Sequence, residues 1–210
     1  MSRSEREQLC DLALRVGADA PTLSGEWTAK DLVVHLLVRE GSPAAIGITV
    51  RPLAWVTEHA SAGLARRDFE GLVARLRGGP PRLSPFAIGR IDAIANTLEF
   101  FVHHEDIRRA QPDWEPRALT PRDQARLWRM IRVGAKELLR SVPVGVVLER
   151  SDVDDPEGRA VVRGGDDPVV VRGLPSELVL FAFGRRPQAR VDLEGSTAAI
   201  AALSGAALGI

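Results

Sequence analysis

Histidines and carboxylates, the residue types that bind divalent metals, stand close together in one segment of this chain. Glu99 and His103 are four residues apart. At about 100° per residue, an α-helix would place them on one face, about 40° apart around its axis. Asp106 falls on the same face, whereas His104 is rotated by about 100° from His103. Because a carboxylate and an imidazole one helical turn apart can bind the same ion, this spacing indicates part of a metal site.

His35 is the best candidate for a third ligand. It lies in the apolar helical segment 32–37, where a neutral imidazole can be buried if a metal and a hydrogen-bond acceptor satisfy its two ring nitrogens. Asp31 is the candidate acceptor for His35, and Asp106 for His103. Two histidines and one carboxylate leave a position open on a tetrahedral ion, which is typical of catalytic zinc. Iron(II), nickel(II) and manganese(II) suit the same donors.

Simpler interpretations of the same residues stay open. A Glu-x-x-x-His pair is common in helices, and a histidine such as His35 is often a hydrogen-bonded core residue. Asp31 also fits the acidic position of a capping box that begins at Thr28. Cys10 is expected to be a small buried residue rather than a nucleophile. The residues expected on loops, helix ends or exposed faces are His59, His104 and Glu105.

Composition and charge narrow the class of protein. Hydrophobic residues make up 45% of the 210 residues, which is ordinary for a globular chain. Lys and Arg equal Asp and Glu at 28 each, so no overall field attracts nucleic acid or an anionic membrane, and neither is expected as a partner. A single cysteine excludes an internal disulfide. The charged N-terminal segment is not a signal peptide, and no apolar run reaches the roughly 20 residues of a membrane span. We therefore expect a cytoplasmic protein.

Helical patterns fill the first two thirds of the chain, and short strands follow. The helices expected there are 4–16, 29–40, 52–77 in one or two pieces, 85–110 and 121–141. The strands expected after residue 142 are 144–149, 159–163, 168–172 and 189–193, with helices at 175–183 and 196–203. Turn signals between the first three strands predict an antiparallel meander. We predict a mainly α domain over residues 1–142 and a small α+β domain over residues 143–210.

Two motifs give the chain a resemblance to a known family. Residues 27–36 match the pattern W-(S/T)-x-x-D-L-x-x-H-L, which resembles the signature of the mycothiol-dependent maleylpyruvate isomerase N-terminal domain in the DinB-like superfamily. Residues 99–110 resemble the second motif of that family. Within them the sequence VHHEDIRRA is similar to that of an actinobacterial branch of the family. The resemblance implies a DinB-like four-helix bundle in which His35, Glu99 and His103 bind a divalent metal, with zinc as the first choice. Residues 174–195 are similar to the family's sterol-carrier-protein-like C-terminal domain.

The resemblance also implies a thiol cofactor, mycothiol, and a small electrophile as substrate. In that family the second domain contributes an arginine, for which Arg185, Arg186 and Arg190 are candidates, with Arg185 in a matching Gly-Arg pair. Three functions stay open: a mycothiol-dependent isomerase or S-transferase, a metal-dependent hydrolase in which the metal activates water, and a non-catalytic small-molecule-binding module. A homodimer is expected by analogy with the superfamily.

Overall fold

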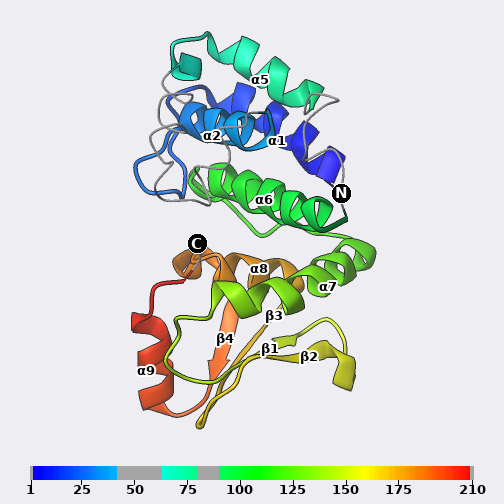
Figure 1. The fold of residues 1–210 in the computed structure, drawn as a ribbon, viewed down its shortest axis with the longest axis vertical. Coiled ribbons are helices and arrows are strands. Elements are labelled where there is room, and N and C mark those ends of the chain that lie inside the picture. The colour runs from blue at the N-terminus through cyan, green and yellow to red at the C-terminus, as the bar shows by residue number, and fades with distance from the viewer. Residues whose placement is uncertain (1, 42–62, 80–89, 209–210) are drawn as a thin grey trace. The chain divides into compact units, whose positions relative to one another are not determined.

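The computed structural model describes residues 2–41, 63–79 and 90–208 (Figure 1). Contacts between Cα atoms divide the chain into two compact units, Met1–Pro116 and Arg117–Ile210. The described part of the first unit is helical, and the second unit combines helices with a small sheet. A helical domain followed by a small α+β domain is therefore the observed architecture.

The first unit packs amphipathic helices around one core. Its helices are α1 (Ser2–Val16), α2 (Ala29–Gly41), α5 (Phe69–Gly78) and α6 (Arg90–Arg109). Helix α1 contacts α2, α5 and α6, and α2 contacts α5. Each helix contributes apolar side chains that are almost completely buried in the same cluster, such as Leu9, Leu32, Leu72 and Phe100. Apolar residues at helical spacing therefore account for this core.

The start of α2 is fixed by a reciprocal cap. The backbone amide of Thr28 donates to Asp31 Oδ2 at 2.9 Å, and the amide of Asp31 donates to Thr28 Oγ1 at 3.2 Å. The preceding loop is held as well, because Thr22 Oγ1 donates to the carbonyl of Trp27 at 2.8 Å and Pro21 forms a bridge with Thr28. These contacts set where α2 begins and hence where its side chains point.

Parts of the predicted helices at 52–77 and 85–110 lie outside the described residues, as does His59. Their described portions are α5, a helical turn at 63–65, and α6. Among the helices that the structure describes, none has the length and apolar character needed to cross a membrane.

The second unit begins with a helix and continues into the sheet. Its elements are α7 (Pro121–Leu138), β1 (Val146–Arg150), β2 (Arg159–Arg163), β3 (Val169–Gly173), α8 (Pro175–Ala182), β4 (Val191–Glu194) and α9 (Thr197–Gly205), with 3-10 turns at 156–158 and 186–188. Helix α8 contacts β1, β3 and β4, and α7 contacts both α8 and β2. Figure 1 shows both helices on one side of the sheet.

The sheet is mixed, so the predicted antiparallel meander is wrong. Its strand order is β2-β1-β3-β4. Strand β1 pairs with β2 antiparallel, but it pairs with β3 in parallel, from Val146 opposite Val169 to Arg150 opposite Gly173. Strand β4 then adds to β3 antiparallel. The first three residues of β1 are buried, as expected for an internal strand that is paired on both sides. Strand β2 lies at the edge of the sheet.

Helix α7 belongs to the second unit, although the boundary predicted at residue 142 assigned it to the first. The Gln124 side chain accepts from the amide of Ser176 at 2.9 Å and donates to Ser176 Oγ at 3.1 Å. Trp128 Nε1 donates to the carbonyl of Glu157 at 3.0 Å. An amphipathic helix must bury its apolar face somewhere, and α7 buries it against the sheet domain.

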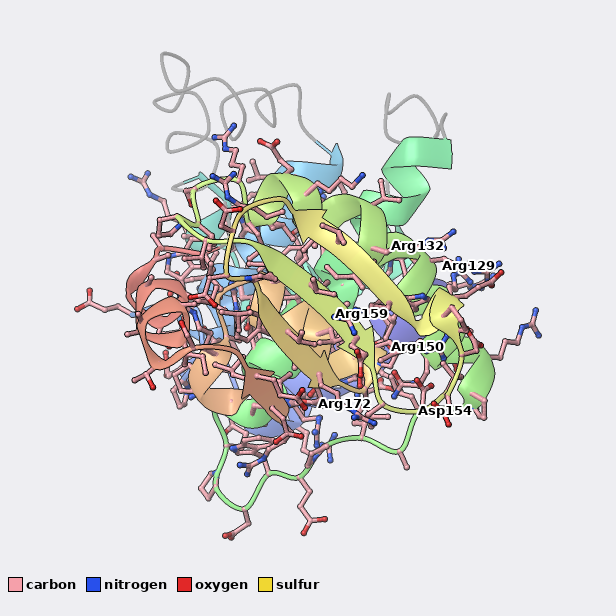
Figure 2. The ribbon with its side chains drawn as sticks, turned by 90° about the horizontal axis from the view of Figure 1, so that it is seen from below. Arg129, Arg132, Arg150, Asp154, Arg159 and Arg172 are labelled. Carbon is pink, nitrogen blue, oxygen red and sulfur yellow. The ribbon has the colours of Figure 1, made fainter. Side chains whose placement is uncertain are left out.

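The other side of the sheet carries charged side chains in a cross-strand row. Glu149 on β1 lies opposite Arg159 on β2 and opposite Arg172 on β3, both of which Figure 2 labels. Glu149 Oε2 lies 3.2 Å from Arg159 Nη1, and Glu149 Oε1 lies 3.7 Å from Arg172 Nη1. Opposite charges at directly facing positions stabilise strand pairing modestly, and they keep this surface hydrated.

Candidate metal centre

Helix α6 brings Glu99 and His103 together, as their spacing of four residues predicts. His103 Nε2 lies 3.1 Å from Glu99 Oε2. The His103 side chain is 9% exposed and that of Glu99 is 16% exposed, so both polar groups lie largely out of solvent. A buried carboxylate and a buried imidazole require a polar partner, which can be the other side chain, a shared metal ion, or both.

Helix α2 supplies His35 to the same place. The His35 and His103 rings meet edge to face, with centroids 5.3 Å apart and planes at 74°. One ligand atom from each of His35, Glu99 and His103 lies within 4.8 Å of the other two. Residues that are far apart in the sequence and sit on two different helices therefore converge on one point.

The donor set fits a divalent metal. Two imidazole nitrogens and one carboxylate oxygen are the donors of zinc sites that keep a position open. Donors that are each about 2.1 Å from a tetrahedral ion lie about 3.4 Å apart, so donor separations of up to 4.8 Å require only small side-chain movements. Manganese, iron and nickel ions use the same donors, so the geometry defines a group that could hold a metal ion without defining which metal.

Electrostatics hold Glu99 ionised and favour a proton on His103. Burial alone would raise the pKa of Glu99, but its hydrogen bond with His103 and the positive charge of Arg39 outweigh burial and hold the pKa at about 2. Burial would lower the pKa of His103, but its hydrogen bonds with Asp106 and Glu99 raise that pKa above the ordinary value. Without a metal, a proton on His103 therefore compensates the two carboxylates beside it.

His35 behaves differently from His103. Burial, reinforced by the neighbouring His103, lowers the pKa of His35 to about 4. The imidazole is therefore neutral at physiological pH, which is the form that binds metals.

Asp106 lies behind His103, on the ring nitrogen that faces away from Glu99. His103 Nδ1 and Asp106 Oδ2 are 2.9 Å apart, and the Asp106 side chain is fully buried. Ser24 Oγ donates to the same oxygen at 2.9 Å. A carboxylate in this place orients an imidazole and raises the basicity of its other nitrogen. Asp106 therefore lies where it would orient His103, behind the ring and outside the group of three ligand atoms.

Asp31 has a different environment from the one proposed for an acceptor of His35. It is exposed, and its Oδ2 accepts from the amide of Thr28 at 2.9 Å and from Thr28 Oγ1 at 2.7 Å. Its described hydrogen bonds thus serve the cap of α2, which was the simpler interpretation.

Two residues beside the centre were not among the predicted site residues, although Trp27 opens the motif at residues 27–36. Arg39 Nη2 lies 3.7 Å from Glu99 Oε1, and Arg39 follows His35 by four residues, so helical spacing alone could have placed it on the same face. The Trp27 ring lies 5.0 Å from the His35 ring, centroid to centroid, with the planes tilted by 48°. Trp27 belongs to the loop before α2, and its spacing from His35 carries no such signal.

The expectation that His104 and Glu105 are exposed is wrong. His104 is 4% exposed and Glu105 is 1% exposed. His104 Nδ1 lies 2.9 Å from Glu5 Oε2 on α1, and Glu105 forms ion pairs with Arg108 and Arg109. Helix α6 is buried around much of its circumference, so the face opposite Glu99 also needs polar partners.

Cys10 is buried, as expected, and burial raises the pKa of its thiol to about 11. A thiol with so high a pKa is almost entirely protonated at neutral pH and is a poor nucleophile.

The arginines considered for substrate binding lie in the second unit. Arg185 Nη1 donates to the carbonyl of Phe183 at 2.6 Å. Arg186 Nη1 donates to the carbonyl of Leu203 at 2.8 Å, at the end of α9. The backbone amide of Arg190 donates to Glu177 Oε2 at 2.9 Å. Each of these residues therefore has a local structural contact within its own unit.

Fold and site together define a class: a two-unit protein with a helical unit, whose His-Glu-His cluster could hold a metal, and a small α+β unit. Two solved structures share this fold. One is a mutant of mycothiol-dependent maleylpyruvate isomerase, with a TM-score of 0.57 and 15% sequence identity. The other is a structure of mycothiol-dependent maleylpyruvate isomerase, with a TM-score of 0.53 and 18% identity. Each comparison covers 92% of this chain and 88% of the other.

At these identities the likeness establishes a related fold. Neither the protein-family models nor the curated proteins compared with the sequence gave a match.

Proposed function

We propose that this protein binds one divalent metal ion and acts as a thiol-dependent metalloenzyme of the isomerase or S-transferase type on a small electrophile. The observation that carries the proposal is the convergence of His35, Glu99 and His103, with ligand atoms within 4.8 Å of one another. The shared fold with mycothiol-dependent maleylpyruvate isomerase supports the thiol-dependent class, with mycothiol as the candidate cofactor.

The three ligands have distinct roles in this proposal. His35 is neutral and ready to bind, because its pKa is about 4. Glu99 supplies the negative charge, and Arg39 at 3.7 Å partly balances it. His103 binds through Nε2 while Nδ1 donates to Asp106. When bound, a metal such as Zn²⁺ acts as a Lewis acid that lowers the pKa of a thiol or water in its open position.

For substrate recognition the proposal names one residue of the second unit. Arg185 is the candidate for holding a carboxylate of the substrate, because guanidinium groups bind carboxylates in bidentate fashion. Arg185 and the homodimer remain predictions.

The proposal is tested by loading metal-free protein with Co²⁺, which has a visible spectrum, and then adding mycothiol. We expect Co²⁺ absorption bands in the wild type and a new sulfur-to-cobalt charge-transfer band after addition of the thiol. His103→Ala should lose the Co²⁺ bands, whereas His59→Ala, which removes a histidine with no proposed ligand role, should keep them. Retention of the bands by His103→Ala would exclude the site.

The two alternative functions give different outcomes in the same experiment. Metal binding without a thiol band, together with hydrolysis that is indifferent to the thiol, favours a metal-dependent hydrolase. Metal binding with neither a thiol band nor turnover favours a non-catalytic binding module.

A further inference from the structure

Trp27 exposes an indole ring beside the candidate metal centre. Trp27 is 40% exposed, although a side chain with this much apolar surface is usually buried. The exposed large hydrophobic residues among those described are Leu14, Trp27, Val133, Val153 and Val161, and of these Trp27 has a ring contact with a proposed metal ligand, His35. The location suggests that the exposure serves the site.

The backbone around Trp27 is held in place, so its position is not that of a loose loop. The Trp27 carbonyl accepts from Thr22 Oγ1 at 2.8 Å, and the Trp27 amide donates to the carbonyl of Ser24 at 3.3 Å. The next residue, Thr28, caps α2. Local hydrogen bonds of this kind hold the Trp27 backbone near the start of α2, and the indole ring contacts His35.

The same loop is also connected to the second histidine. Ser24 Oγ donates to Asp106, which in turn contacts His103. The Leu23 amide donates to the Asp106 carbonyl at 3.1 Å. One loop therefore contacts His35 through Trp27 and supports His103 through Asp106. A loop held to both ligand-bearing helices in this way keeps the backbone of Trp27 close to the proposed metal site.

We propose that Trp27 forms the apolar wall of the ligand subsite at the metal centre. It would favour small anionic ligands, the substrate included, whose part beside the metal-bound atom is planar, unsaturated or aromatic. An indole face beside the ligand atom that binds the metal would gain contact area and stacking with such a body. A hydroxylated chain in the same place would offer little of either. This inference rests on the proposed metal-binding function.

The test compares two thiols on Co²⁺-loaded protein, thiophenol and 2-mercaptoethanol, each titrated through the sulfur-to-cobalt charge-transfer band. The measured quantity is the ratio of the two dissociation constants, compared between variants so that the intrinsic difference between the thiols cancels. In Trp27→Ala we expect the preference for thiophenol over 2-mercaptoethanol to fall about tenfold. Trp27→Phe should retain most of that preference. The matched control is Trp114→Ala, which removes a tryptophan whose ring lies 4.7 Å from the Arg109 guanidinium; its ratio should equal that of the wild type.

Three results would overturn the inference. An unchanged ratio in Trp27→Ala would show that the indole does not contact the ligand. An equal loss of affinity for both thiols would show that Trp27 only supports His35. A wild type that binds no Co²⁺ would refute the metal function itself, and this failure is visible in the Co²⁺ spectrum before any thiol is added.

Discussion

His103 has a carboxylate at each of its ring nitrogens. Glu99 lies 3.1 Å from Nε2, and Asp106 lies 2.9 Å from Nδ1. A protonated imidazole satisfies both contacts when no metal is present. With a metal bound, His103 would give up the proton on Nε2 and keep its contact with Asp106. The environment of this one side chain thus accounts for its stability without an ion and would also suit metal binding.

Asp106→Asn is predicted to weaken metal binding by about tenfold or more, because it removes the negative charge that supports His103. Zinc competition titrations would measure the change. Asp31→Asn is the matched control, since Asp31 is exposed and hydrogen-bonds to Thr28; it should leave zinc affinity unchanged. Equal affinities for the wild type and Asp106→Asn would show that Asp106 has no part in the centre.

Metal affinity is predicted to rise with pH because of the titration of one proposed ligand, His103. The pKa of His103 is raised by Asp106 and Glu99, so His103 must release a proton when it binds a metal. His35, with a pKa of about 4, and Glu99, with a pKa of about 2, are already deprotonated above about pH 5. Between about pH 5 and the raised pKa of His103, the zinc association constant should therefore increase about tenfold per pH unit. Calorimetry in several buffers would count the protons released, and an affinity independent of pH in that range would contradict the assignment.

The sequence predicted these ligands unevenly. Glu99 and His103 share a helix, so their convergence follows from a spacing of four residues. His35 lies on another helix. Its place in an apolar helical segment made it the candidate third ligand, and the resemblance to a family motif strengthened its link to the other two. The burial of His104 could not be predicted, because its partner Glu5 lies on α1, 99 residues away in the chain. Helical periodicity describes neighbours on one helix and carries no information about contacts between helices.

Helix α6 contains ionic pairs that are buried, which is unusual for charged groups. Glu105→Ala is predicted to lower the free energy of unfolding by about 3 kcal/mol, because the Arg109 guanidinium then loses a carboxylate in a buried position. The side chains of this pair are each 1% exposed. Urea denaturation would measure the loss.

The matched control for that prediction is Glu137→Ala on α7. Glu137 pairs with Arg140, but their side chains are 69% and 74% exposed. Exposed pairs of this kind contribute between zero and about 1 kcal/mol. If both variants lost the same stability, burial of the Glu105 pair would not explain its effect.

The elements themselves were largely predictable, and their partners were not. The valine-rich segments and their turn signals located the strands, but the parallel pairing of β1 with β3 skips the strand between them in sequence. Turn residues report only on consecutive strands. The amphipathic pattern of α7 likewise predicted a helix with a buried face, without indicating which core that face would join.

The two compact units imply a specific boundary for independent folding. A fragment of residues 117–210 is predicted to unfold cooperatively, whereas a fragment of residues 143–210 should not, because it lacks α7. Leu127 and Ile131 on α7 are fully buried, and removing them would expose apolar surface of the second unit. Circular dichroism with urea would distinguish the fragments. A stable 143–210 fragment would instead support the boundary near residue 142 that the sequence indicated.

The fold relates the chain to proteins whose chemistry depends on a thiol, and the metal is the feature on which the functional proposal depends. The most direct test is elemental analysis with native mass spectrometry on purified wild type, His35→Ala, Glu99→Gln and His103→Ala. We predict about one divalent ion per chain in the wild type and a marked loss in each variant, which should remain folded. A wild type that remains metal-free after incubation with zinc, or variants that retain a full complement of metal, would contradict the proposed centre.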